Sequence, residues 1–210
     1  METTQATYGR TSAGWRARVS RPVILINGLP GAGKTTLGRG LSRLLRLPLF
    51  SKDVIKEAHA DVLGVDAPDE RPQPAWNQAL GAAATETMWA LLRHANGGAI
   101  CDSAWLPNTR DLVVRGLRRA NVAPADILEI WCEVPAALAR RRFEARAPSR
   151  HPIHGQQVGL DRKWATWQAE AGPLAFGDVL QVDTTREVDI DALAAEVRDR
   201  VLAGGTSASR

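Results

Sequence analysis

The chain has 210 residues, of which 44% are hydrophobic and 24% charged, which suits one globular α/β domain with its own core. No run of about 18 apolar residues occurs, which excludes a membrane-spanning helix, and the net charge of +4 is too small to indicate nucleic-acid binding. The two cysteines, Cys101 and Cys132, fall in predicted strands and are expected to be buried free thiols, in keeping with a reducing compartment.

The N-terminal part of the chain leads into a phosphate-binding motif. Residues 1–20 lack the apolar centre of a signal peptide, so we expect a flexible tail and a cytoplasmic protein. Residues 22–27 form an apolar run that predicts a buried strand. Residues 28–35 then read GLPGAGKT and match the P-loop pattern G-x-x-x-x-G-K-[ST] at every fixed position. Leucines recur at helical spacing behind this loop and predict a helix over residues 34–46.

A strand, a glycine-rich loop and a helix in this order predict a nucleoside triphosphate site. The loop N–H groups and the helix N-terminus favour a bound anion. Lys34 is expected to reach the terminal phosphates, and the Thr35 hydroxyl to hold Mg²⁺. The predicted nucleotide-binding residues of the loop are Gly28, Leu29, Pro30, Gly31, Ala32, Gly33, Lys34, Thr35 and Thr36.

The rest of the chain alternates strands with helices. We expect further strands at residues 48–51, 99–102, 126–133 and 179–182. Helices are expected at residues 52–63, 75–94, 108–120, 135–147, 161–170 and 190–202. This alternation predicts an α/β fold with a parallel sheet covered on both faces, in one domain over residues 21–204 followed by a flexible tail over residues 205–210. Ligands bind such sheets beyond the carboxyl ends of the strands.

Two carboxylates follow predicted strands. Asp53 comes just after the second strand and has two interpretations. It either faces the P-loop and accepts the proton of a substrate hydroxyl, or it only complements the dipole of the next helix. Asp102 ends the third strand and resembles the Walker-B carboxylate that holds the Mg²⁺ of a P-loop. We therefore expect Thr35 and Asp102 to form the Mg²⁺ site.

Five arginines lie within residues 140–150. Arg142 and Arg146 share a helix face, and their planar guanidinium groups suit phosphate oxygens. We expect them to close over the triphosphate in a lid at about residues 140–162. His151 and His154 lack partners at metal-ligand spacing and are expected in the lid or at the substrate rim.

Four tryptophans near the predicted loops and lid have two interpretations. They either pack in the core or form an apolar wall of a substrate pocket. These residues are Trp76, Trp105, Trp164 and Trp167.

Together, the P-loop, the Ser51–Asp53 segment, Cys101–Ser103 and the pair Arg142 and Arg146 resemble the P-loop small-molecule kinases. This group includes gluconate and shikimate kinases, chloramphenicol phosphotransferase, the 5′-kinase part of polynucleotide kinases and other AAA-type ATP-binding kinases. The resemblance implies a three-layer P-loop NTPase fold with a five-stranded sheet in the order 2-3-1-4-5, ATP as donor and a helical lid.

The resemblance also implies individual roles. Asp53 matches the carboxylate that acts on the acceptor hydroxyl, and the loop with Asp183 passes near the adenine. The chain lacks the Asp-x-Asp of shikimate kinases and the acceptor-site arginine pattern of nucleoside monophosphate kinases. Both of these specific assignments are therefore disfavoured.

The sequence thus predicts an ATP- and Mg²⁺-dependent kinase for a hydroxyl of a small molecule, such as a sugar, an antibiotic or another metabolite. The predicted catalytic residues are Lys34, Asp53, Arg142 and Arg146. A polynucleotide 5′-hydroxyl kinase stays an alternative, although the scattered positive charge outlines no channel for nucleic acid. An ATPase or nucleotide switch is a second alternative, but it leaves Asp53 without a purpose. The acceptor and the oligomeric state, monomer or homodimer, are left open.

Overall fold

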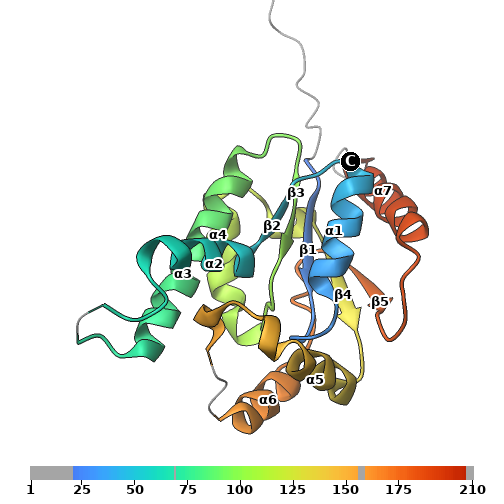
Figure 1. Ribbon diagram of the computed structural model, residues 1–210. Helices are drawn as coiled ribbons and strands as arrows, with labels where there is room; N and C mark the ends of the chain where they lie inside the picture. The colour runs from blue at the N-terminus through green and yellow to red at the C-terminus, as the bar shows by residue number, and fades with distance from the viewer. Residues whose placement is uncertain (1–20, 69, 156–158, 207–210) are drawn as a thin grey trace, which may run out of the picture.

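The computed structural model describes residues 21–68, 70–155 and 159–206. The predicted tail at residues 1–20, the last four residues of the predicted C-terminal tail and residues 156–158 of the predicted lid lie outside the described residues. The fold is built on a five-stranded parallel sheet in the order β2-β3-β1-β4-β5 (Figure 1). The strands are β1 (Val23–Asn27), β2 (Leu49–Ser51), β3 (Ala99–Asp102), β4 (Ile127–Glu133) and β5 (Asp178–Asp183). Both the predicted strands and the predicted strand order are confirmed.

Helices connect the strands. They are α1 (Lys34–Leu45), α2 (Lys52–Leu63), α3 (Gln73–His94), α4 (Arg110–Arg119), α5 (Ala136–Ala145), α6 (Leu160–Ala169) and α7 (Ile190–Thr206). The stretch expected to be a loop after α5 contains two short 3-10 turns, η3 (Ala147–Ser149) and η4 (Pro152–His154). Helix α7 extends two residues into the stretch expected to be a tail.

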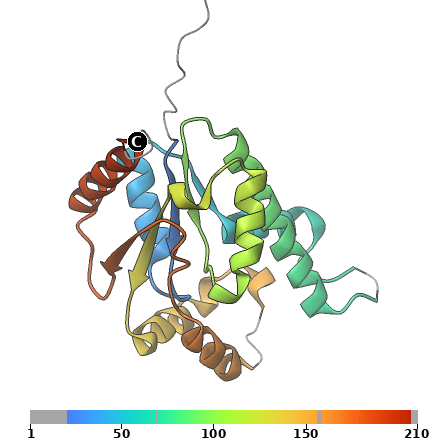
Figure 2. The same cartoon turned by 180° about the vertical axis from the view of Figure 1, so that it is seen from behind.

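The two faces of the sheet are covered by different helices, as the front and back views show (Figures 1 and 2). Alternate residues of β1 point to opposite faces, as in any strand. Ile24 and Ile26 pack in one core cluster with α1 and α7, whereas Val23 and Leu25 pack in the other with α3 and α4. This double burial explains why the strands read as continuous apolar runs.

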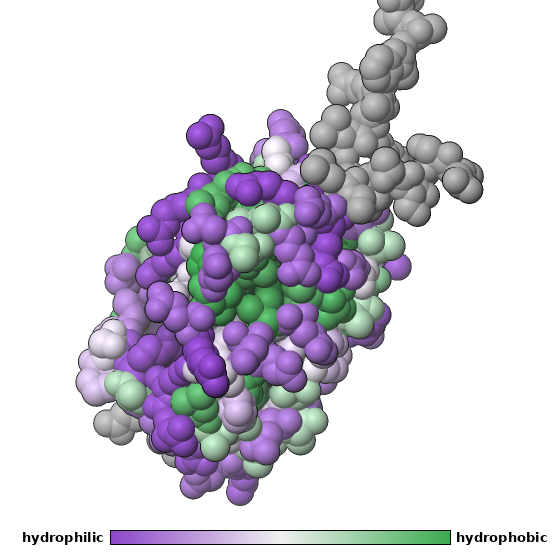
Figure 3. All heavy atoms as spheres, turned by 90° about the vertical axis from the view of Figure 1, so that its right-hand side faces the viewer, coloured by the Kyte–Doolittle hydropathy of each residue, from purple (hydrophilic) through white to green (hydrophobic). Residues whose placement is uncertain are grey.

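Two further predictions concern the core and the membrane. Cys101 and Cys132 are both buried and free, as expected. Among the described residues, no helix is long and apolar enough to cross a bilayer. On the side of α7 and β5, apolar residues gather near the centre of the surface and are bordered by hydrophilic ones (Figure 3).

Candidate active site

The loop after β1 lies at the centre of the carboxyl edge of the sheet. Its glycines adopt backbone angles that other residues rarely adopt, with φ of +88° at Gly31 and +87° at Gly33. A Cβ atom on Gly31 would lie only 2.1 Å from the carbonyl oxygen of Ala139 in α5. Helix α5 therefore packs directly on the loop, and only glycine fits between them.

Lys34 is folded back over this loop. Its Nζ donates hydrogen bonds to the carbonyl oxygens of Gly28 and Leu29, both at 2.9 Å. Burial lowers the pKa of Lys34, and the negative charge of Asp102 opposes that shift. The ammonium group thus sits at the loop, where a phosphate oxygen would be a stronger partner than a carbonyl.

Asp102 lies beside the start of α1. Parallel pairing places it next to Ile26 of β1 and Ser51 of β2. Its Oδ2 accepts hydrogen bonds from Thr35 Oγ1 at 2.7 Å and Ser51 Oγ at 3.3 Å. The residue is 3% exposed, and burial raises the pKa of its carboxyl, while the charge of Lys34 opposes the rise.

This cluster fits a magnesium ion. A hydroxyl and a carboxylate oxygen meet at one point, and oxygen is the ligand that Mg²⁺ prefers, with phosphates and water completing its shell. Within the described ranges, no three His, Cys, Asp or Glu side chains meet to form an all-protein metal site. Such a site is not needed for Mg²⁺ that arrives with a nucleotide.

Asp53 lies in the first turn of α2, and its side chain is 62% exposed. Lys52 Nζ lies 4.0 Å from its Oδ1. Its charge raises the pKa values of Lys34 and Asp102, which places the carboxylate within electrostatic reach of the P-loop. Asp53 is therefore an exposed carboxylate in the first turn of α2, where it complements the helix dipole, and its charge acts on two residues of the P-loop region.

The structure separates the two predicted lid arginines. Arg142 donates hydrogen bonds to the carbonyl oxygens of Thr184 and Thr185, at 2.8 and 2.9 Å, so it holds the loop after β5. Arg146 is exposed, and its charge contributes to lowering the pKa of Lys34. The helix expected over residues 135–147 ends at Ala145, so Arg146 lies just beyond α5 and does not share a helix face with Arg142.

Asp183 is the last residue of β5, directly before that loop. Its Oδ1 accepts a hydrogen bond from the Thr185 N–H at 2.8 Å, and hydrogen bonding to Thr185 lowers the pKa of its carboxyl. The next residue, Thr184, hydrogen-bonds to the carbonyl of Glu133 and lies 4.0 Å from the position of a Cβ on Gly33. The loop after β5 therefore lies beside the P-loop.

The two histidines pair with carboxylates of α2. His151 Nε2 lies 3.0 Å from Asp61 Oδ1, and His154 Nε2 lies 2.8 Å from Glu57 Oε1. Burial lowers the pKa of His154, while the hydrogen bond to Glu57 opposes that shift. Both histidines thus fix the η4 segment to α2.

Most of the tryptophans near the predicted loops pack inside the protein. Trp105 is buried and stacks on Trp89, with ring centroids 5.4 Å apart. Trp164 is buried against Phe143, and Trp167 is partly buried in the same aromatic cluster. Trp76 is partly buried and donates a hydrogen bond to the carbonyl of Gly64. Core packing accounts for Trp105 and Trp164.

Sequence reasoning missed a buried network under the P-loop. Asn27 Nδ2 donates to Glu129 Oε1 at 2.8 Å and to the Trp105 carbonyl at 2.9 Å. Asn27 Oδ1 accepts from the N–H groups of Gly28 and Trp105, at 2.7 and 2.9 Å. Two features of the sequence could have predicted this network. Asn27 is a polar residue at the end of an apolar strand, and Glu129 is a charged residue inside another apolar strand.

The chain resembles known proteins in two ways, by a short stretch of similar sequence and by a similar fold over most of its length. A cytidylate kinase of Pyrobaculum arsenaticum is 39% identical over 44 residues, which cover 21% of this chain and only 24% of that relative. A solved structure from Chloroflexus aurantiacus, described as a candidate kinase, is 26% identical with a TM-score of 0.70 and covers 86% of this chain and 98% of that one. Shikimate kinase of Aquifex aeolicus shares the fold, with 13% identity, a TM-score of 0.51 and coverage of 86% and 96%.

A family model described as an AAA domain matches residues 23–170, which is more than half of the chain. That range includes the P-loop, Asp53, Asp102 and the arginine-rich α5. The chain therefore belongs to this AAA-domain family, and its fold is that of the P-loop kinases.

Proposed function

We propose that the protein is an ATP-dependent phosphotransferase that moves the γ-phosphoryl group of ATP to a hydroxyl of a small molecule. The observation that carries the proposal is the convergence of three features at one edge of the sheet. These are the P-loop with Lys34, the hydrogen-bonded pair Thr35 and Asp102, and the exposed carboxylate of Asp53. The kinase names borne by several similar proteins support the same chemistry.

The donor half of the proposed site binds phosphate. The N–H groups of the glycine loop and the N-terminus of α1 favour the charge of the nucleotide, and Lys34 exchanges its two carbonyl partners for phosphate oxygens. Thr35 and Asp102 would hold Mg²⁺, which supplies positive charge to the β- and γ-phosphates when bound. Arg142 would keep the loop after β5 beside the adenine, with Asp183 directly before that loop.

The acceptor half centres on Asp53. Its exposed carboxylate would accept a hydrogen bond from the acceptor hydroxyl and take its proton as the phosphoryl group arrives. Arg146, whose charge acts on Lys34, would add positive charge beside the transferring group.

Replacing Asp53 by Asn tests the acceptor half. Transfer of label from ATP to a panel of hydroxylated metabolites is expected to fall by about 100-fold or more, because a general base is worth that much. Nucleotide affinity should stay nearly unchanged, since Asp53 is not part of the P-loop. The matched control is Asp66→Asn, in an exposed loop.

Two outcomes would count against the proposal. Equal transfer rates in the Asp53→Asn variant would remove Asp53 from the mechanism. Label that passes only to water, whichever acceptor is supplied, would favour an ATPase instead of a kinase.

A further inference from the structure

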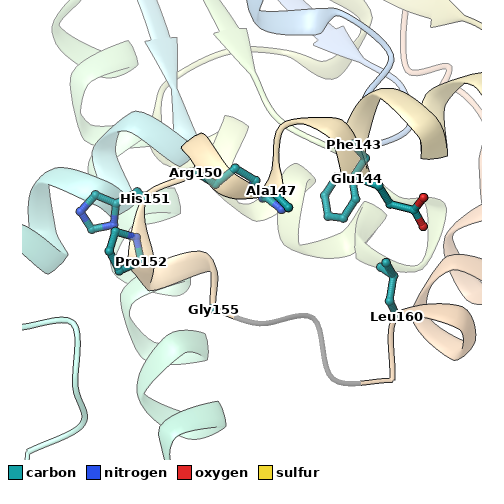
Figure 4. Close-up of a pocket in the computed structure, with 8 residues that line it drawn as sticks. All are labelled: Phe143, Glu144, Ala147, Arg150, His151, Pro152, Gly155 and Leu160. Carbon is teal, nitrogen blue, oxygen red and sulfur yellow. The ribbon is translucent and has the colours of Figure 1, made fainter.

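Two features of the molecule lie outside the proposed chemistry. One is a cavity of about 510 Å³ between α5, η4 and α6, where the guanidinium of Arg150 lies 4.5 Å from the centroid of the Phe143 ring (Figure 4). This contact packs the cation into the wall of the cavity. The other feature is the buried network around Asn27, which is hydrogen-bonded to the first residue of the P-loop. A change in the network therefore reaches the proposed nucleotide site directly.

The Asn27 side chain takes the place of a backbone peptide between β1 and β3. The register between the two strands ends at Ile26 and Asp102. Beyond this point β1 turns into the P-loop at Gly28, whose φ is +144°. The Asn27 amide accepts a hydrogen bond from the Trp105 N–H and donates one to the Trp105 carbonyl, both at 2.9 Å. It thus satisfies two backbone groups that the strand itself no longer reaches.

All four hydrogen-bonding positions of the Asn27 amide are filled. Its Oδ1 also accepts from the Gly28 N–H at 2.7 Å, and its Nδ2 also donates to Glu129 Oε1 at 2.8 Å. Asn27 and Glu129 are each 1% exposed. A reversed amide would place its NH₂ group against two N–H donors and its oxygen against two acceptor oxygens. The four partners therefore favour a single orientation of the side chain.

This orientation concerns both the P-loop and the metal carboxylate. The Gly28 carbonyl accepts a hydrogen bond from Lys34 Nζ at 2.9 Å. When Lys34 turns to the phosphates in the proposed reaction, that bond is lost, and the bond to Asn27 still holds the peptide of Gly28. On its other side, Asn27 holds Trp105, which lies three residues after Asp102.

We propose that Asn27 is a positioning residue of the nucleotide site. It holds the start of the P-loop against the segment that follows Asp102, and it acts through these groups from its buried place beneath them. This inference rests on the proposed function, because it takes the P-loop and Asp102 as the site of the nucleotide and Mg²⁺. A site that is already ordered loses less freedom when its ligand binds, so the network should raise nucleotide affinity.

Calorimetric titration with ADP and Mg²⁺ tests the assignment. Asn27→Ala removes all four hydrogen bonds, and affinity is expected to fall about tenfold or more at a temperature where unfolding curves show a folded protein. Val197→Ala truncates a buried side chain of α7 and is the control for lost stability, with the affinity of the wild type. In the free protein, hydrogen exchange followed by NMR should increase more at the Gly28 and Trp105 amides of Asn27→Ala than at other sheet amides.

Asn27→Asp supplies a second readout that does not depend on truncation. The new carboxyl group keeps the shape and the oxygen that faces Gly28, but its other oxygen faces Glu129. Two carboxylates in contact favour sharing one proton, which restores a donor toward Glu129. Relative to the wild type at the same pH, the affinity of this variant should be low at pH 8 and recover about fivefold or more at pH 6. Asn96→Asp, at an exposed position between α3 and β3, is the matched control and should not depend on pH in this way.

Undiminished affinity in both Asn27 variants would overturn the inference. An equal loss of affinity in Val197→Ala and Asn27→Ala would also overturn it, because stability would then be the cause. A relative affinity of Asn27→Asp that stays the same from pH 8 to pH 6 would count against it too. Failure of the proposed function has a separate signature, which is a wild-type protein that binds no ADP.

Discussion

At the scale of single residues, the buried polar side chains beneath the P-loop have a structural role. Glu129 is 1% exposed, and its carboxylate accepts hydrogen bonds from Asn27 Nδ2 and from the N–H groups of Leu174 and Ala175. Asn27 in turn binds the first N–H of the P-loop, at Gly28. The buried charge is therefore satisfied, and it ties the 174–175 turn to the nucleotide loop.

Glu129→Gln is expected to lower the free energy of unfolding by about 2 kcal/mol. The amide replaces one carboxylate oxygen by an NH₂ group, and this donor would face the N–H donors that surround the side chain. Denaturant unfolding measures the change. Glu133→Gln, at the exposed end of the same strand, is the control and should change stability by less than about 0.5 kcal/mol. Equal stability of the two variants would show that the Glu129 carboxylate is dispensable.

The two thiols give a second prediction for single residues. Burial raises the pKa of Cys101 and of Cys132 to about 12, so neither is a thiolate at neutral pH. A chromogenic disulfide reagent at pH 8 should react with no thiol of the native protein and with both after unfolding in guanidinium chloride. A fast reaction in the native protein would contradict the burial of β3 or β4.

At the scale of elements, the contact between α5 and the P-loop shapes the site. The carbonyl of Ala139 occupies the space where a side chain on Gly31 would begin. Because α5 also carries Arg142, and Arg146 directly follows its last residue, the close approach of α5 sets where both arginines lie. The packing of one helix thereby links the P-loop to the loop after β5.

Gly31→Ala is expected to destabilise the protein by about 2 to 3 kcal/mol, from overpacking and a left-handed backbone. Nucleotide affinity should fall with it, because the loop must move away from α5. Gly81→Ala, in the middle of α3 with nothing within 4 Å, should instead stabilise the protein by up to about 1 kcal/mol. Similar melting temperatures in the two variants would refute the close packing.

At the scale of the whole molecule, the strand order places the site. With β1 in the centre, β3 lies beside it and brings Asp102 to Thr35, and β2 follows with Ser51 and Asp53. Loops that are far apart in sequence thus meet at one edge of the sheet, as expected for parallel α/β proteins.

A ligand that binds only the folded protein stabilises it. ADP with Mg²⁺ at 100 times its dissociation constant should raise the free energy of unfolding by about 2.7 kcal/mol. The shift should grow with ADP concentration and be lost in Lys34→Met. An unchanged unfolding midpoint in the wild type would exclude a functional nucleotide site.

The sequence by itself determined the fold class, and it supplied the P-loop on which the proposed donor half of the site rests. The P-loop and the alternation of strands and helices depend on neighbouring residues, so local patterns were enough to predict β1 to β5 and the helices between them. Boundaries differed by a few residues where 3-10 turns continue a helix, as at η3.

Only the tertiary structure decided which distant side chains meet. Asn27 and Glu129 are 102 residues apart, and His154 and Glu57 are 97 apart, yet each pair is hydrogen-bonded. The sequence predicted Arg142 and Arg146 on one helix face, but α5 ends at Ala145, and Arg142 alone binds the loop after β5. Periodicity predicts the face of an element, whereas the order of the strands and the packing of helices on them decide what that face contacts.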